Sequence, residues 1–299
     1  MKLIKTAIIF KAEIPKDIAA LNENLQKKRF SECMPTQLRS IGFVPTLVGG
    51  ALIEEFPGGL AYTVRIDDKI IPGSVVKAEV KKRTQELELR FDKKVSKKEK
   101  AEIKEQVMLE LAKRALTKTT AEVTCFYEFE SGYLILPTSS EKIADICTSM
   151  LTEAVEGVKL DFVTSVNITL ALTKRLASWL DNGEGFGDFE PCTEVTLANE
   201  SRKISVKMSS LQQAHKGLTE GLDAGFSVQS IGFQLDGTTF KLNPKFHLKA
   251  IAFEKPEEED EEEEDNYWPA EAALCVQAVS AIVTQLAEML ADLADPEES

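Results

Sequence analysis

The chain has 299 residues, of which 43% are hydrophobic, and its formal net charge at pH 7 is −13. This size and composition are typical of a folded protein and argue against a fibrous or largely disordered chain. The five cysteines are scattered and odd in number, which argues against a disulfide framework and indicates reduced thiols in a cytoplasmic protein.

The sequence patterns of residues 1–73 and 119–165 predict a central α+β region. Alternation of apolar and polar residues favours strands, whereas apolar residues three or four apart favour helices. Prolines and glycines interrupt residues 30–50, so we expect loop with short elements there. We expect strands over residues 2–12, 60–66, 121–129 and 133–136, and helices over residues 16–28 and 140–156.

Residues 69–118 have an unusual charge for so acidic a chain. They contain fifteen Lys and Arg against eight Asp and Glu, an excess of +7, so the rest of the chain sums to −20. Helical spacing predicts a first helix with Ser74 as its N-cap and a second that begins at the capping box of Ser96 and Glu99 and ends near Leu116. We therefore expect residues 74–118 to form a projecting basic helical hairpin that attracts an anionic partner. The alternative is a pair of solvated helix faces.

The sequence patterns of residues 166–299 predict a second α+β region. Residues 254–265 hold ten acids and one lysine, which predicts an acidic loop. Strands and helices occur in blocks rather than in βαβ alternation, so the fold class is α+β with mixed or antiparallel sheets and packed helices. The longest nearly uncharged run, residues 272–287, is shorter than the roughly 20 residues that a membrane span needs, so we expect no membrane partner. We expect strands over residues 194–197, 203–208, 226–235, 239–242 and 246–253, and helices over residues 170–180, 211–222 and 270–293.

A search for catalytic chemistry finds no convincing site. The only two histidines, His215 and His247, have no cysteine or carboxylate at ligand spacing, which disfavours a zinc site. The glycines of residues 183–187 are not followed by the Lys-Ser/Thr of a phosphate-binding loop. Asp67, Asp68 and Glu79 with Lys81 resemble the carboxylates and lysine of a metal-dependent nuclease site. However, Glu79 and Lys81 would point to different faces of one helix. We predict no catalytic residue, no metal, no cofactor and no small-molecule substrate.

Several short segments resemble, in order, the recombination-associated RdgC family. Residues 30–33 and 42–45 are similar to the family's Phe-x-Pro-Cys and Gly-Trp-Val-Pro, and residues 69–72 to its Lys-Ile-Leu-Pro. The second helix of the basic segment, ending in Arg114-Ala115-Leu116, resembles the family's helix with its Arg-Ala-Phe end. Residues 170–173 and 183–186 match its Leu-x-Leu-Thr and Gly-Phe stretches. These matches cover most of the chain, although none is a catalytic signature.

The resemblance implies a ring-shaped homodimer whose positively charged hole encircles double-stranded DNA without sequence preference. It also implies that the protein restrains recombination by the recombinase RecA, by occupying DNA, and that it is cytoplasmic and nucleoid-associated. Lys and Arg would contact phosphates, which gives affinity without base readout. We expect the DNA-binding residues to be Lys77, Lys81, Lys82, Lys113, Arg114 and Lys118 of the hairpin, with Lys203 and Lys207 on a strand.

The chain departs from the family pattern in two places. Leu116 stands where the family has an aromatic residue at the meeting point of two projections, so we expect Leu116 to be an apolar dimer gate. The acidic run 254–265 is longer than the family's. Two alternative functions remain: a metal-dependent DNA exonuclease, a label also attached to the family, and a protein-interaction scaffold that uses the acidic run.

Overall fold

The computed structural model describes residues 3–208, 211–254 and 268–291. The described chain is α+β, with helices packed on two antiparallel sheets. The strands are β1 Ile8–Glu13, β2 Arg39–Val44, β3 Ile53–Phe56, β4 Gly59–Lys69, β5 Thr117–Glu128, β6 Tyr133–Leu136, β7 Lys159–Phe162, β8 Glu190–Ala198, β9 Lys203–Lys207, β10 Ser227–Leu235, β11 Thr238–Leu242 and β12 Leu248–Ala252. The helices are α1 Ile18–Gln26, α2 Gly73–Phe91, α3 Lys97–Ala112, α4 Glu141–Ala154, α5 Ile168–Asn182, α6 Leu211–Asp223 and α7 Trp268–Ala291.

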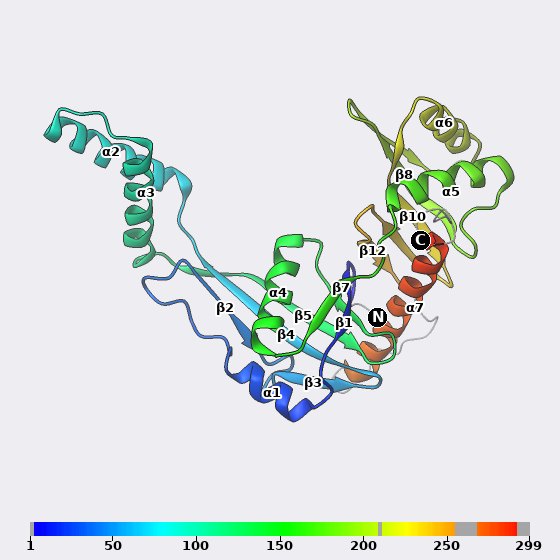
Figure 1. The fold of residues 1–299 in the computed structure, drawn as a ribbon, viewed down its shortest axis with the longest axis horizontal. Coiled ribbons are helices and arrows are strands. Elements are labelled where there is room, and N and C mark those ends of the chain that lie inside the picture. Colours follow the sequence, from blue (N-terminus) through cyan, green and yellow to red (C-terminus); the bar gives the residue numbers. More distant parts are fainter. Residues whose placement is uncertain (1–2, 209–210, 255–267, 292–299) are drawn as a thin grey trace.

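The first sheet has the order β2-β4-β5-β6-β1-β7, with β3 also paired to β4. The second sheet has the order β12-β11-β10-β8-β9. All the strand ladders are antiparallel, so the mixed arrangement that the sequence left open does not occur among the described strands. In Figure 1 the first sheet lies in the middle of an open, curved molecule, with α2 and α3 at one end and the second sheet near the other.

The two sheets are joined by the N-terminal segment and by α7. Ala7 and Leu248 exchange two main-chain hydrogen bonds, of 2.8 and 2.9 Å, just before β1 enters the first sheet. One apolar core then runs from Ile135 and Phe126 of the first sheet through Val279 of α7 to Phe233 of the second. The helix α7 is long and apolar enough to cross a membrane by length and composition alone, so the shortness of its uncharged run is not a valid argument against a span. Its broad apolar face is buried in this core.

Local signals placed most elements within a few residues, and residues 30–50 are loop with one short strand, as expected. Strand β2 lies there, between Arg39 and Val44, and pairs with β4. Gly42 occurs within β2 because a Cβ at this position would collide with the main chain of Phe30, which runs directly alongside. The glycine therefore permits a close approach and does not end the strand. Strands β3 and β7 were not predicted.

The borders of the two hairpin helices also differ from expectation. Ser74 is not the N-cap of α2, because Pro72 occupies that position and its carbonyl accepts hydrogen bonds from the Val75 and Val76 N–H groups, at 3.0 and 3.2 Å. The second helix ends at Ala112 and not near Leu116, since the Leu116 carbonyl already accepts from Ile70 N–H beside the β4–β5 pairing, at 2.8 Å. Strand β5 consequently begins at Thr117, four residues earlier than expected.

Two expectations reach outside the described residues. Of the acidic run 254–265, only Glu254 is described, and the predicted end of the last helix at residue 293 lies beyond the described end of α7. The boundaries drawn at residues 73, 118 and 165 between a central region, a hairpin and a second region stay predictions.

Candidate nucleic-acid interface

The helices α2 and α3 pack on each other through their own small apolar cluster. Val76 and Val80 of α2 and Ile103 and Val107 of α3 are buried together, separately from the cores of the two sheets. The predicted capping box at the start of α3 is confirmed, with 2.7 Å from Ser96 N to Glu99 Oε2 and 3.3 Å from Glu99 N to Ser96 Oγ. The two helices therefore form a locally stabilised unit at the end of the sheet (Figure 1).

One of the hairpin's cations is used to join the two helices. The Arg83 guanidinium on α2 donates to Glu110 of α3 through both terminal nitrogens, at 3.1 and 2.5 Å, and to Glu79 at 2.9 Å. Hydrogen bonding to Glu110 is the largest cause of a raised pKa for Arg83. A bidentate Arg–carboxylate pair fixes geometry as well as charge. Arg83, Glu79 and Glu110 thus hold the hairpin together and do not present a net positive charge.

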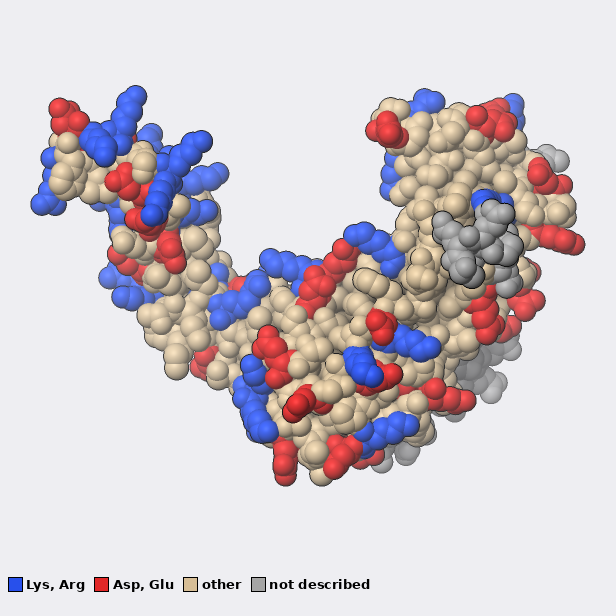
Figure 2. All heavy atoms as spheres, in the orientation of Figure 1, with Lys and Arg blue, Asp and Glu red and all other residues tan. Residues whose placement is uncertain are grey.

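The predicted phosphate-binding side chains of the hairpin are exposed and form no ion pair with any described residue. Lys77 and Lys81 lie one turn apart on α2, with Lys82 beside them. Lys113 and Arg114 follow the last residue of α3, where the helix dipole favours positive charge. Lys118 lies on β5 opposite Asp68 of β4. Figure 2 shows Lys and Arg side chains gathered around this end of the molecule.

Lys203 and Lys207 lie away from the hairpin. Both are exposed on β9, the edge strand of the second sheet, and strand alternation places them on one face with Ser205. Strand β9 pairs with β8, which lies at the other end of the curved molecule from α2 and α3 (Figure 1). One chain therefore does not bring the two sets of lysines together.

Leu116 lies at the root of the hairpin and is 78% exposed. The hydrogen bond from Ile70 N–H to the Leu116 carbonyl places a second apolar residue on the neighbouring strand end, and Ile70 is 49% exposed. Ile70 was not predicted as part of this apolar patch, because recognising it requires the β4–β5 register. Large apolar side chains with so little packing are candidates for a contact with another molecule.

Comparison with known proteins places nearly the whole chain in one family. A family model described as "Putative exonuclease, RdgC" matches residues 3–293. The chain belongs to the RdgC family. Its resemblance to that family, inferred above from short motifs, is thereby confirmed.

The relatives of the chain are named "Recombination-associated protein RdgC". The protein from Pseudomonas paraeruginosa is 26% identical over 243 residues, which cover 80% of this chain and 78% of the relative. The protein from Burkholderia cenocepacia is 21% identical over 260 residues, covering 85% and 83%. The protein from Dechloromonas aromatica is 24% identical over 283 residues, covering 92% of each chain.

A metal-dependent exonuclease would need clustered carboxylates that hold a metal ion, and three carboxylates lie near the RdgC hairpin. Asp67 accepts from Arg65 at 2.9 Å, and Asp68 accepts from Arg39 at 2.6 Å. Glu79, the third carboxylate of the nuclease-like set, is held by Arg83. The described residues contain no group of three or more His, Cys, Asp or Glu that could hold a metal ion. These carboxylates therefore act as partners of arginines here.

Asp68 links three strands at the root of the hairpin. Besides Arg39 of β2, Thr120 of β5 donates its hydroxyl to Asp68, at 2.6 Å. Hydrogen bonding from Arg39 is the largest cause of a lowered Asp68 pKa, and desolvation opposes it. A carboxyl group with a lowered folded-state pKa stabilises the fold only while ionised. Its contribution is full above the ordinary value of 3.8 and is lost as the pH falls through the lower folded value.

We expect Asp68→Asn to lower the free energy of unfolding at pH 7 by about 1 kcal/mol, because it leaves Arg39 without its ion pair at a half-buried position. The difference from the unsubstituted protein should shrink as the pH falls below 3.8. Urea denaturation of both proteins, at pH 7 and in steps down to about pH 2.5, measures this difference in the free energy of unfolding. Asp145→Asn, at an exposed position of α4, is the control. A difference that stays constant down to the lowest pH would contradict this role of Asp68.

Proposed function

We propose that this RdgC-family protein binds double-stranded DNA without sequence preference and restrains RecA-mediated homologous recombination by occupying the DNA. The observation that carries the proposal is the set of exposed cations on the hairpin, which form no ion pair with the described residues, in a chain of net charge −13. An acidic protein should avoid DNA unless a local basic surface compensates for the repulsion. Contacts of this kind reach phosphates and not base edges, so they give no sequence preference.

We propose further that two chains form a ring-shaped homodimer around the duplex. The single chain is an open, curved molecule with the basic hairpin at one end, so a second copy related by a two-fold axis could close the curve (Figure 1). In this arrangement Leu116 and Ile70 are the apolar contact at one junction of the ring. Lys203 and Lys207 would supplement the hairpin from the second sheet. A cytoplasmic, nucleoid-associated location follows from this proposal.

Binding to a fluorescent duplex across a salt series, with and without magnesium, tests the DNA function. Six to eight engaged phosphates should give a slope of log K against log salt of roughly −5 to −7, since each one contributes about −0.9. The double variant Lys77→Gln/Lys81→Gln should make the slope shallower by about 0.9 for every phosphate that its side chains no longer bind, equally for unrelated sequences. Lys16→Gln/Lys27→Gln, at exposed positions beside and at the end of α1, is the charge-matched control.

The same measurement separates the alternatives. Unchanged affinity and slope in the Lys77→Gln/Lys81→Gln variant would contradict the hairpin as the DNA-binding surface. Shortening of the duplex only when magnesium is present would instead support the exonuclease. An absence of binding even at low salt would contradict both functions and favour the protein-interaction scaffold.

Leu116→Asp tests the ring. It places two like charges at the proposed junction, so the ring should open there. We expect the lifetime of the complex on closed circular duplex DNA at high salt to fall at least tenfold, whereas Val48→Asp, at a fully exposed loop position, should leave it unchanged. The lifetime is measured as retention on the circular DNA after a high-salt challenge. Analytical ultracentrifugation measures the oligomeric state. Equal retention of the Leu116→Asp protein and its parent would exclude Leu116 from the junction.

A further inference from the structure

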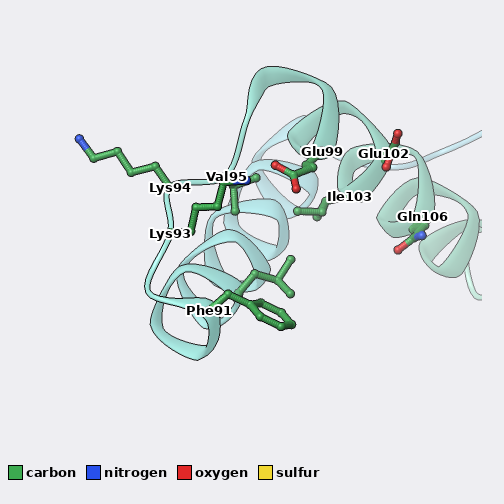
Figure 3. A pocket seen from close by; sticks show the side chains of 9 residues that line it. Phe91, Lys93, Lys94, Val95, Glu99, Glu102, Ile103 and Gln106 are labelled. Atoms are coloured by element: carbon green, nitrogen blue, oxygen red, sulfur yellow. The ribbon is translucent and has the colours of Figure 1, made fainter.

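The far tip of the hairpin contains a crevice between the end of α2 and the first turns of α3. Its volume is about 590 Å³, within the range of roughly 300–1,000 Å³ that small-molecule sites occupy. Leu87 and Phe91 of α2, Val95 of the connecting turn and Ile103 of α3 supply its apolar lining. Figure 3 shows the Phe91 ring on one side of this space and Ile103, Glu102 and Gln106 along α3 on the other.

Phe91 is an aromatic residue that the fold leaves mostly exposed. The residue is 66% exposed and lies outside the apolar cluster that joins α2 to α3. No other aromatic ring among the described residues stacks on it, and the Arg90 guanidinium lies over its face, with 5.7 Å from the guanidinium carbon to the ring centroid. An exposed aromatic face beside an arginine stabilises this hairpin little. It is, however, a good stacking platform for a planar ligand.

The charges around the crevice identify the kind of ligand. Two acids beside the turn accept from its main chain: Glu88 from Val95 N–H at 3.1 Å, and Glu99 from Ser96 N–H at 2.7 Å. Asp92 in the turn and Glu102 on the wall of the crevice are exposed. The lysines of this turn and of the first turn of α3 are exposed and form no ion pair with any described residue. They are Lys93, Lys94, Lys97 and Lys98. Residues 87–106 hold seven Lys and Arg against five Asp and Glu, so the surroundings of the crevice keep an excess of positive charge.

We propose that this crevice binds an unpaired nucleobase of single-stranded DNA. The base stacks on Phe91 over the apolar lining, and Lys93 and Lys94 bind the adjoining phosphates. Glu102 and Gln106, one turn apart on α3, face the edge of the base, where they can accept from and donate to its exocyclic groups. A lysine-bordered crevice of this shape suits a polyanion with planar groups better than a neutral or basic peptide.

The proposal gives the hairpin two modes of binding. Bases in a duplex are stacked and cannot enter the crevice, so the tip contributes only where strands are unpaired, as in gaps, overhangs or single strands. The cations nearer the root of the hairpin serve duplex and single strand alike. This inference rests on the proposed DNA function, and it adds a preference for unpaired regions within that function.

Binding to a single strand that carries 2-aminopurine at its centre tests the proposal. Stacking on Phe91 should change the fluorescence of this base on binding. Phe91→Ala should abolish the change and weaken single-strand binding about 5- to 100-fold, with affinity and salt slope on a blunt duplex unchanged. Phe91→Trp should retain both. Leu89→Ala removes another exposed apolar side chain, 85% exposed and nearly half a turn away around α2, so it should behave as the parent protein.

The outcomes distinguish this inference from the function on which it rests. If the parent protein binds neither duplex nor single strand, the DNA function itself fails. If it binds duplex with a steep salt dependence but Phe91→Ala still binds the single strand tightly with an unchanged fluorescence response, the base-binding crevice alone is overturned. A Phe91→Ala variant that changes only self-association would show that the crevice holds a second copy of the chain, and would also overturn the proposal.

Discussion

The pairing of β4 with β5 is the constraint on which the position of the candidate site depends. The register runs from Gly59 opposite Glu128, in the sheet core, out to Lys69 opposite Thr117, at the base of the hairpin. Near its outer end the ladder shifts register after Ile66, a bulge that re-aims the strands. There Asp68 connects to Arg39 on one side and to Thr120 on the other. Helices α2 and α3 thus stand on three cross-linked strands at the outer end of this ladder.

The charged groups of the hairpin fall into two sets, those paired within the fold and those that are exposed and unpaired among the described residues. Some ionic groups hold the fold together: Arg83 clamps α2 to α3, and Glu99 closes the start of α3. Others, such as Lys77 and Lys81, are exposed and form no ion pair within the described chain. Exposed ion pairs contribute little to stability, whereas unpaired cations on one projection can release counterions from a phosphate backbone. Ion pairs among the described residues do not account for the excess of positive charge in residues 69–118, and the proposed DNA function rests on this excess.

Sequence reasoning succeeded where the physical cause is local. The capping box at Ser96 and the apolar periodicity of α7 involve neighbouring residues, so both could be predicted. The place of strand β2 within residues 30–50 was not predicted, because Gly42 is required by the approach of Phe30, a proximity that spacing does not reveal. For the site, the exposed lysines could be predicted from charge density. The Asp68 linkage, the Ile70–Leu116 patch and the exposure of Phe91 depend on register and packing between segments, so they could not be.

Removal of the hairpin tests the central claim most directly. Because Lys69 and Thr117 are antiparallel partners, a two-residue Asn-Gly turn can join them in place of residues 70–116 with the sheet register preserved. The apolar cluster of the hairpin is separate from both sheet cores, so the remainder should keep its fold and cooperative unfolding. We predict that this shortened protein, measured beside the full chain at low salt, does not bind duplex DNA. A shortened protein that folds and binds duplex DNA as tightly as the full chain would contradict the hairpin as the DNA-binding element.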